Sequence, residues 1–78
     1  MTNSKELNQI IKNSGLKRTY IAKCLGISLT ALTYKINNRY PFNARQIDLL
    51  CKLLNIDSVE QRFAIFFASE VEEQSTSA

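Results

Sequence analysis

Cationic side chains flank a short uncharged segment, Thr30–Tyr34, in the first half of the chain. Lys17 and Arg18 precede this segment, and Lys35 and Arg39 follow it. Guanidinium and ammonium groups bind phosphate oxygens, whereas threonine and tyrosine side chains can contact the edges and methyl groups of bases. The pattern indicates recognition chemistry, in which phosphate contacts surround a small centre that reads bases.

The charges of the whole chain are distributed in the same sense. Residues 1–45 carry eight basic side chains and one acidic side chain, a net charge of +7, and residues 46–78 carry two basic and six acidic ones, a net charge of −4. Together they give the net charge of +3 for the 78 residues. This split predicts that one end of the protein meets a polyanion. An ordinary solvated charged surface is the alternative.

Catalytic and metal-binding chemistry is disfavoured by the residue types that are missing. Histidine is absent, and Cys24 and Cys51 do not form the CxxC pair of a zinc site. Only two glycines occur, and neither a nucleophile–base pair nor a glycine-rich phosphate loop is present. We therefore expect no enzymatic activity, no metal and no cofactor. Both cysteines are expected to be small, half-buried apolar side chains.

Length and hydropathy predict one soluble domain without a membrane partner. A chain of 78 residues has room for a single small core, and no apolar run approaches the roughly 18 residues that span a bilayer. The first residues are too polar for a secretory signal. We expect a cytoplasmic domain over residues 1–69 and a disordered acidic and polar tail over residues 70–78.

The elements that must position these side chains are five helices, each with a start or stop signal. Apolar spacing and capping residues predict helices over Ser4–Ser14, over Arg18–Leu25, from Ser28 to Asn37 or Asn38, from Asn43 to Asn55 and from Ser58 to about Ser69. Capping boxes are expected at Asn3 with Glu6 and at Asn43 with Gln46.

The second and third of these helices are joined by about three residues around Gly26. Glycine permits the positive φ of a sharp turn. The small Ala22 lets the two helices approach closely, and Leu32 can fill the angle between them. A small residue, a turn glycine and a buried aliphatic residue at this spacing are typical of a DNA-binding helix-turn-helix.

On these residues the chain resembles the Xre/Cro family of phage and bacterial transcriptional repressors. The likeness covers about residues 5–67 and rests on Leu16, Ile21-Ala22, Leu25-Gly26-Ile27-Ser28, Leu32, Ile36 and the block Ile47–Ile56. It implies an all-α fold, a compact five-helix domain of the lambda-repressor-like type, which dimerises on operator DNA in a bacterial cytoplasm. The chain departs from the family pattern at Arg18, Lys35 and Asn38, where the family commonly has glutamine, an aliphatic residue and glycine.

A helical wheel of the third helix assigns roles to the candidate site residues. Leu32 and Ile36 point inward with Leu29 beside them, and the predicted base contacts on the outward side are Thr30, Ala31, Thr33 and Tyr34. The predicted phosphate contacts are Lys17, Arg18, Ser28, Lys35, Asn38 and Arg39. The alternative is that Tyr34 lies along the protein surface and that the threonines are ordinary solvent-facing residues.

An aromatic run follows near the C-terminal end of the helical region. Its members Phe63, Phe66 and Phe67 either complete the core or form part of a patch that closes a two-fold dimer. A dimer would place two recognition helices one DNA turn apart. The sequence thus predicts a sequence-specific DNA-binding transcriptional regulator, a phage Cro-like repressor that occupies a palindromic operator as a homodimer. The alternative is an antirepressor or co-repressor that binds another repressor protein through the same fold.

Overall fold

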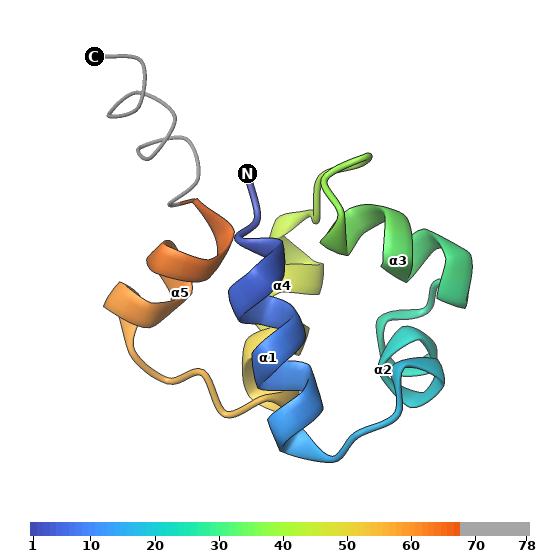
Figure 1. Cartoon of the computed structure of the whole chain (residues 1–78), viewed down its shortest axis with the longest axis horizontal. Coiled ribbons are helices and arrows are strands. Elements are labelled where there is room, and N and C mark those ends of the chain that lie inside the picture. Colours follow the sequence, from blue (N-terminus) through green and yellow to red (C-terminus); the bar gives the residue numbers. More distant parts are fainter. Residues whose placement is uncertain (68–78) are drawn as a thin grey trace.

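Five helices follow one another along residues 1–67, the part of the chain that the computed structural model describes, and this part contains no strand. They are α1 (Ser4–Ser14), α2 (Arg18–Leu25), α3 (Leu29–Ile36), α4 (Ala44–Leu53) and α5 (Val59–Phe66). In Figure 1, α1 lies near the centre, with α2 and α3 on one side of it and α5 on the other. α2 packs against α3 and α4, and α1 packs against α3 and α5. The predicted all-α class is confirmed.

Each helix contributes one completely buried side chain to the core: Leu7, Ile21, Leu32, Leu50 and Ile65, all 0% exposed. Burial of an aliphatic side chain of this size contributes roughly 1.5–3 kcal/mol, so that every helix is held by the same cluster. The loop before α4 adds Phe42, whose ring packs edge to face on Phe66 with the ring centroids 5.9 Å apart. None of the helices in the described residues is long and apolar enough to cross a membrane.

Helices begin at the predicted residues because the capping side chains satisfy amides that the helix itself leaves free. The side chain of Asn43 accepts from the Gln46 N–H at 2.8 Å, and the Gln46 side chain accepts from the Asn43 N–H at 3.0 Å, which confirms this capping box. Ser28 and Ser58 cap α3 and α5 in the same way. α2 begins at Arg18, and its N-cap residue Lys17 makes no side-chain capping bond.

The capping box predicted for α1 is only half formed. Asn3 Oδ1 accepts from the Glu6 N–H at 3.2 Å, as expected. The backbone N–H of Asn3, however, donates to the carbonyl of Ile65 in α5. It is therefore not available to the Glu6 carboxylate, which would accept it in a complete capping box. That carboxylate accepts from Asn3 Nδ2 instead, at 3.5 Å. A tertiary hydrogen bond has replaced the reciprocal half of the local motif.

Left-handed residues end the helices where glycine or asparagine was available. Gly15 and Gly26 have φ of +76° and +74°, and Asn38 and Asn55 have φ of +67° and +57°. α5 ends at Phe66, with Phe67 as its C-cap residue, before the predicted end at Ser69. The last two residues of the predicted helix and the predicted tail over 70–78 lie outside the described residues.

The two cysteines differ, which corrects the prediction that both are half-buried. Cys51 is 1% exposed inside the core, and burial raises the pKa of its thiol. Cys24 is exposed on α2, because it lies outside the helix face that Ile21, Ala22 and Leu25 bury. A hydrogen bond with the Cys24 thiol, one helical turn away, is the main reason that the pKa of the exposed Tyr20 is raised.

An ion-pair network ties α4 to α5. The Asp48 carboxylate lies 3.1 Å from Lys52 Nζ, one turn along α4, and 3.6 Å from the Arg62 guanidinium of α5. Lys52 first and Arg62 second hold the pKa of Asp48 below its ordinary value. The charged form of Asp48 is therefore favoured in the folded state more than in the unfolded chain.

This network gives the stability of the fold a defined pH dependence. Because the folded-state pKa of Asp48 is lowered, its contribution is complete above about pH 4, the range of an unfolded aspartate, and is lost as pH falls through the folded-state value. We expect the free energy of unfolding of wild type to exceed that of Asp48→Asn at neutral pH, and the gap to close in acid. Urea unfolding followed by circular dichroism measures both proteins, and a gap that stays constant with pH would contradict the assignment.

Candidate nucleic-acid interface

The connection between α2 and α3 consists of the three residues Gly26–Ser28. The N–H groups of Gly26 and Ile27 bond back to the carbonyls of the last turn of α2, which closes that helix tightly. Ala22 is 2% exposed and Leu32 is 0% exposed, so a small residue and an aliphatic residue occupy the space between the two helices. These contacts fix how α3 sits on α2.

The inward side of α3 is as predicted, and its outward side differs in detail. Leu32 and Ile36 are buried, and Thr30 and Thr33 are exposed. Ala31 and Tyr34 are half-buried, so they offer less surface than the wheel indicated. Leu29 was placed with the inward residues but is 44% exposed. As the first residue of α3 it has no preceding helical turn to cover, a positional signal that could have identified it.

Two hydroxyl groups of this region are used by the backbone of α3 itself. Ser28 Oγ accepts from the Ala31 N–H at 3.0 Å, which leaves the hydroxyl proton for an outside acceptor such as a phosphate oxygen. Thr33 Oγ1 donates to the Leu29 carbonyl at 3.0 Å. The Thr33 hydroxyl is thus not a free donor for a base, although its oxygen can still accept.

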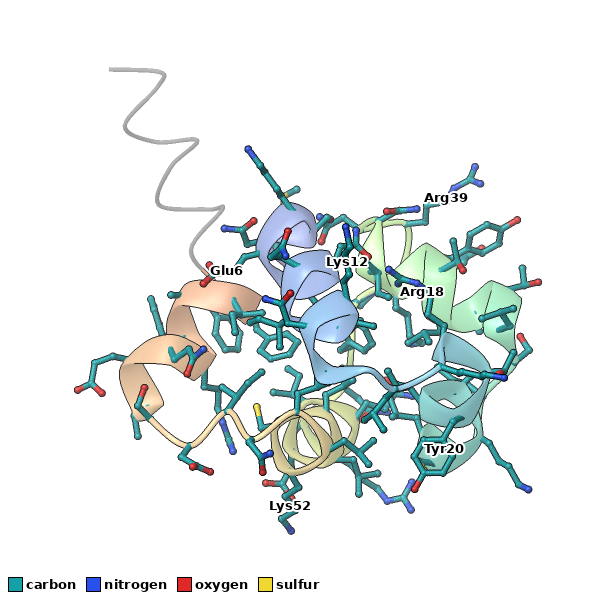
Figure 2. The ribbon with its side chains drawn as sticks, turned by 60° about the horizontal axis from the view of Figure 1, so that its bottom comes forward. Glu6, Lys12, Arg18, Tyr20, Arg39 and Lys52 are labelled. Carbon is teal, nitrogen blue, oxygen red and sulfur yellow. The ribbon has the colours of Figure 1, made fainter. Side chains whose placement is uncertain are left out.

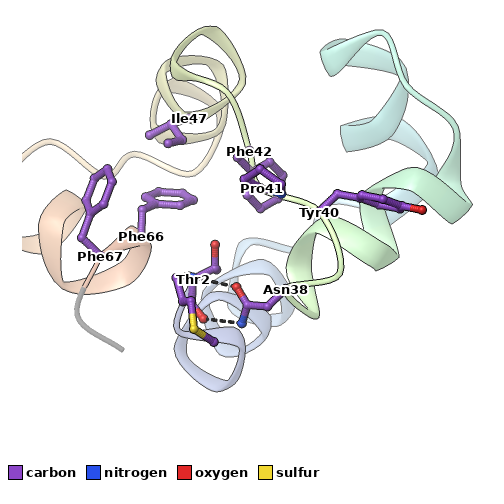
Figure 3. Close-up of a pocket in the computed structure, with 9 residues that line it drawn as sticks. Thr2, Asn38, Tyr40, Pro41, Phe42, Ile47, Phe66 and Phe67 are labelled. Atoms are coloured by element: carbon purple, nitrogen blue, oxygen red, sulfur yellow. Dashed lines mark hydrogen bonds between the residues drawn. The ribbon is translucent and has the colours of Figure 1, made fainter. Parts of the chain in front are cut away.

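Tyr34 lies in a cluster of three side chains, with Arg39 over its ring and Tyr40 tilted against it. The guanidinium carbon of Arg39 lies 4.8 Å from the centre of the Tyr34 ring, and the ring of Tyr40 lies 6.0 Å away at 53°. The Arg39 N–H also donates to the Tyr34 carbonyl at 2.8 Å. Figure 3 shows Tyr40 reaching from the loop after α3 back along that helix. The Tyr34 ring is therefore packed between Arg39 and Tyr40 instead of projecting alone into solvent.

Lys35 has a role that the sequence did not indicate. Its Nζ donates to the carbonyl of Pro41 at 2.9 Å, which ties the end of α3 to the loop that leads into α4. An ammonium group has three N–H donors, so two remain for a phosphate. The predicted phosphate contact at Lys35 stays a prediction, with the side chain already positioned by the loop.

Asn38 does not serve as the predicted phosphate contact. Its Oδ1 accepts from the Thr2 N–H at 2.8 Å, and its Nδ2 donates to the Thr2 carbonyl at 2.9 Å and to Ser4 Oγ at 3.3 Å. Figure 3 shows two of these bonds as dashed lines. Because both amide hydrogens and the amide oxygen are occupied, this side chain fastens the N-terminal residues to the end of α3. The prediction is corrected on that ground.

Cations of three elements lie on the same side of the molecule as α3. Figure 2 shows Lys12 of α1, Arg18 of α2 and Arg39 of the loop after α3 on one side, with Lys52 at the opposite end of the view. Arg18 and Thr33 line a shallow depression of about 180 Å³. Lys12, which is not among the predicted phosphate contacts, shares a second depression with Arg18 and Lys5. The seven-residue spacing of Lys5 and Lys12, two turns of one helix face, was the available signal.

The aromatic run of α5 divides between core and surface. Phe66 is 3% exposed against Phe42, so it belongs to the core, and its predicted place in a dimer interface is wrong. Phe63 and Phe67 are 54% and 42% exposed and lie with ring centroids 5.4 Å apart. Val59, which is 76% exposed, precedes them at the same four-residue spacing. Val59, Phe63 and Phe67 form the α5 stripe, one apolar face of that helix open to solvent.

No cluster of three or more metal-ligating side chains occurs among residues 1–67. Comparisons of the chain with models of known families, with curated protein sequences and with solved structures return no match. Conclusions about function therefore depend on the geometry of α3 and its cations.

The corrected role of Asn38 yields a test of this geometry. Asn38→Gly keeps the left-handed backbone and removes three side-chain hydrogen bonds, which we expect to lower the free energy of unfolding by about 1–2 kcal/mol. Asn38→Ala should cost about 1 kcal/mol more, because alanine tolerates φ of +67° poorly. Urea unfolding distinguishes the two variants. Equal stability of Asn38→Gly and wild type would show that these bonds do not hold the N-terminal residues.

Proposed function

We propose that this protein is a sequence-specific DNA-binding regulator in which α2 and α3 form a helix-turn-helix and α3 lies in the major groove. The observation that carries the proposal is the outward side of α3, an uncharged surface bordered by Arg18 on α2 and by Arg39 in the loop after α3. Helix-turn-helix proteins use their second helix for base edges and the surrounding residues for phosphates. The resemblance to Xre/Cro repressors in sequence supports the same function.

Affinity in this proposal comes mainly from the cations. Lys17, Arg18, Lys35 and Arg39 neutralise phosphates, and Ser28 adds an uncharged contact at the start of α3. Four neutralised phosphates predict a log–log salt slope of about −3.6 for each bound protomer. The protein would act as a Cro-like repressor does, by occupying an operator so that polymerase or a competing repressor is excluded.

The proposal is tested by neutralising the bordering cations one at a time. Arg18→Gln and Arg39→Gln should each weaken binding to every duplex and reduce the salt slope by about 0.9. Lys52→Gln is the matched control, since Lys52 pairs with Asp48 at the far end of the molecule and should leave binding unchanged. Fluorescence anisotropy at several salt concentrations gives both quantities. If all three variants lowered affinity equally, the assignment of a DNA face around α3 would fail.

Specificity needs its own measurement in the same assay. DNA from beside the gene for this protein is compared with a scrambled duplex of equal length and composition. A specific regulator should prefer the native sequence by about 10³-fold or more. Equal affinity for both duplexes at every salt concentration would refute a sequence-specific regulator.

Pairing of two protomers on DNA is part of the proposal, and the α5 stripe is its contact surface. Large aromatic side chains bury about 150–250 Å² each, so the half-exposed Phe63 and Phe67 offer about 200 Å² together. A standard interface buries about 800 Å² on each partner. The stripe is therefore too small for a stable dimer in dilute solution, and we expect dimers only where adjacent half-sites raise the effective concentration.

Substitution within the α5 stripe tests this pairing. Phe63→Ser should abolish cooperative binding to a palindromic duplex while leaving affinity for a single half-site unchanged, because α5 and α3 lie on different sides of α1. Glu60→Gln, which changes an exposed residue of α5 outside the stripe, is the control. Gel-shift titration of palindrome and half-site separates the two effects. Undiminished cooperativity in Phe63→Ser would place the dimer contact elsewhere.

The exposed Phe63–Phe67 pair also favours a second candidate function, an antirepressor or co-repressor whose partner is another repressor protein. Such a protein would bind a repressor through the α5 stripe and would show no DNA affinity alone. The anisotropy experiment above decides between the two, since only the regulator binds its native duplex in the absence of a partner.

A further inference from the structure

We infer that α3 selects its DNA sites through contacts between its apolar atoms and the C5 methyl groups of thymine. The inference rests on the proposed function and specifies it, because it names the chemical group that the outward side of α3 recognises. The preferred sites are then rich in A·T pairs, with thymines placed under α3 in the major groove, where this methyl group is displayed.

Four residues of α3 make up the surface concerned, here called the methyl patch: Leu29, Thr30, Thr33 and Tyr34. Leu29 and Thr33 are four residues apart and form one row along the helix, and Thr30 and Tyr34 form the neighbouring row. Leu29 is 44% exposed, both threonines are exposed and Tyr34 is half-buried. Leu29 thus adds a large, nearly half-exposed aliphatic side chain to the start of this row, next to the exposed Thr33.

The hydrogen bond of Thr33 increases the apolar character of the patch. Its hydroxyl donates to the Leu29 carbonyl, so the helix backbone already takes up the donor of this side chain. The methyl group of Thr33 makes no such hydrogen bond and remains available for apolar contact. Leu29 and Thr33 together thus present carbon atoms rather than donors to a ligand on this side.

Side chains that read bases by paired hydrogen bonds are absent from the patch. Guanine is read by arginine or lysine and adenine by asparagine or glutamine, through bidentate bonds. Three of the residues of these types around the patch already have partners, since Lys35 bonds to Pro41, Asn38 bonds to Thr2 and Arg39 stacks on Tyr34. Arg18 and Asn37 lie beside Thr33 at the margin of the patch rather than within it. Any discrimination between base pairs by the patch itself must therefore come from shape and apolar contact.

Charge complementarity identifies duplex DNA as the occupant of this surface. The patch is uncharged, while Arg18 lies at the margin beside Thr33 and Arg39 lies at the margin beside Tyr34. A protein partner would gain little from cations on both margins, whereas the two strands of a major groove place phosphates there. The apolar groups on the floor of that groove are the thymine methyl groups.

The experiment compares duplexes that differ only in these methyl groups. Sites are first selected from duplexes with a random central segment two helical turns long, and the best site is then made with thymidine or with deoxyuridine at every thymine position. Deoxyuridine keeps all hydrogen-bonding groups and lacks the methyl. We expect the deoxyuridine site to bind more weakly by about fourfold for each methyl group that contacts the patch, with an unchanged salt slope.

Two variants assign the methyl effect to the patch, and a third is the control. Thr33→Ser retains the hydroxyl that donates to Leu29 and loses only a methyl, so the ratio of thymidine to deoxyuridine affinity should fall by about fourfold. Leu29→Ala should reduce the ratio at least as much. Tyr20→Ala removes exposed apolar surface on α2, away from Arg18 and Arg39 in Figure 2, and should leave the ratio at its wild-type value. A ratio that is unaffected by both patch variants would overturn the inference.

The outcomes separate this inference from the proposed function. Equal affinity for thymidine and deoxyuridine sites, with sequence preference intact, overturns the inference and leaves the regulator. Absence of binding to any duplex at low salt refutes both. A parallel series with 5-methylcytosine in place of cytosine tests the other source of a C5 methyl. If 5-methylcytosine raised the affinity while removal of the thymine methyl groups did not lower it, the patch would recognise methylated cytosine and not thymine. That result also overturns the inference.

Discussion

The burial of Leu32 and Ile36 determines which side of α3 faces solvent. These residues lie four positions apart, in one row along the helix, and are 0% and 2% exposed. Because this row is buried in the core, Thr30 and Tyr34 on the opposite side of the helix must point away from the core. The turn at Gly26, with φ of +74°, is what brings α3 close enough to α2 for Leu32 to be covered. The candidate site is thus a consequence of core packing and of one left-handed residue.

Polar contacts from the first residues of the chain then hold the loop that follows α3. Thr2 is clamped by Asn38, the Ser4 hydroxyl donates to the carbonyl of Ile36, and the Asn3 N–H donates to the carbonyl of Ile65. The N-terminal segment therefore connects the end of α3 with the end of α5. The Asn38 amide is fully occupied by this arrangement, and the loop that carries Arg39 is held in place by it. Ordering before binding reduces the entropy that a phosphate contact must otherwise overcome.

The sequence predicted most helix boundaries because their signals act over three or four residues. Ser28 needs only the Ala31 amide to start α3, and Asn43 needs only Gln46 to start α4. Hydrogen bonds between residues far apart in the sequence are not indicated by any such local signal. Asn38 meets Thr2 across 36 positions of sequence, and nothing near Asn38 indicates that bond. In the candidate site, cation positions relative to α3 were accessible from spacing, whereas the occupied amide of Asn38 and the contact of Lys35 with Pro41 depend on tertiary placement.

The aromatic run of α5 shows why apolar composition alone leaves an interface undecided. Phe63, Phe66 and Phe67 have the same hydropathy, yet only Phe66 of the three is buried in the core, with its ring against that of Phe42. α5, the helix that carries the exposed Phe63, lies on the side of α1 opposite to α3 (Figure 1). A protein bound to the α5 stripe would therefore leave the outward side of α3 accessible. If the outward side of α3 binds DNA as proposed, a protein on the α5 stripe would act on the pairing of protomers rather than on that contact.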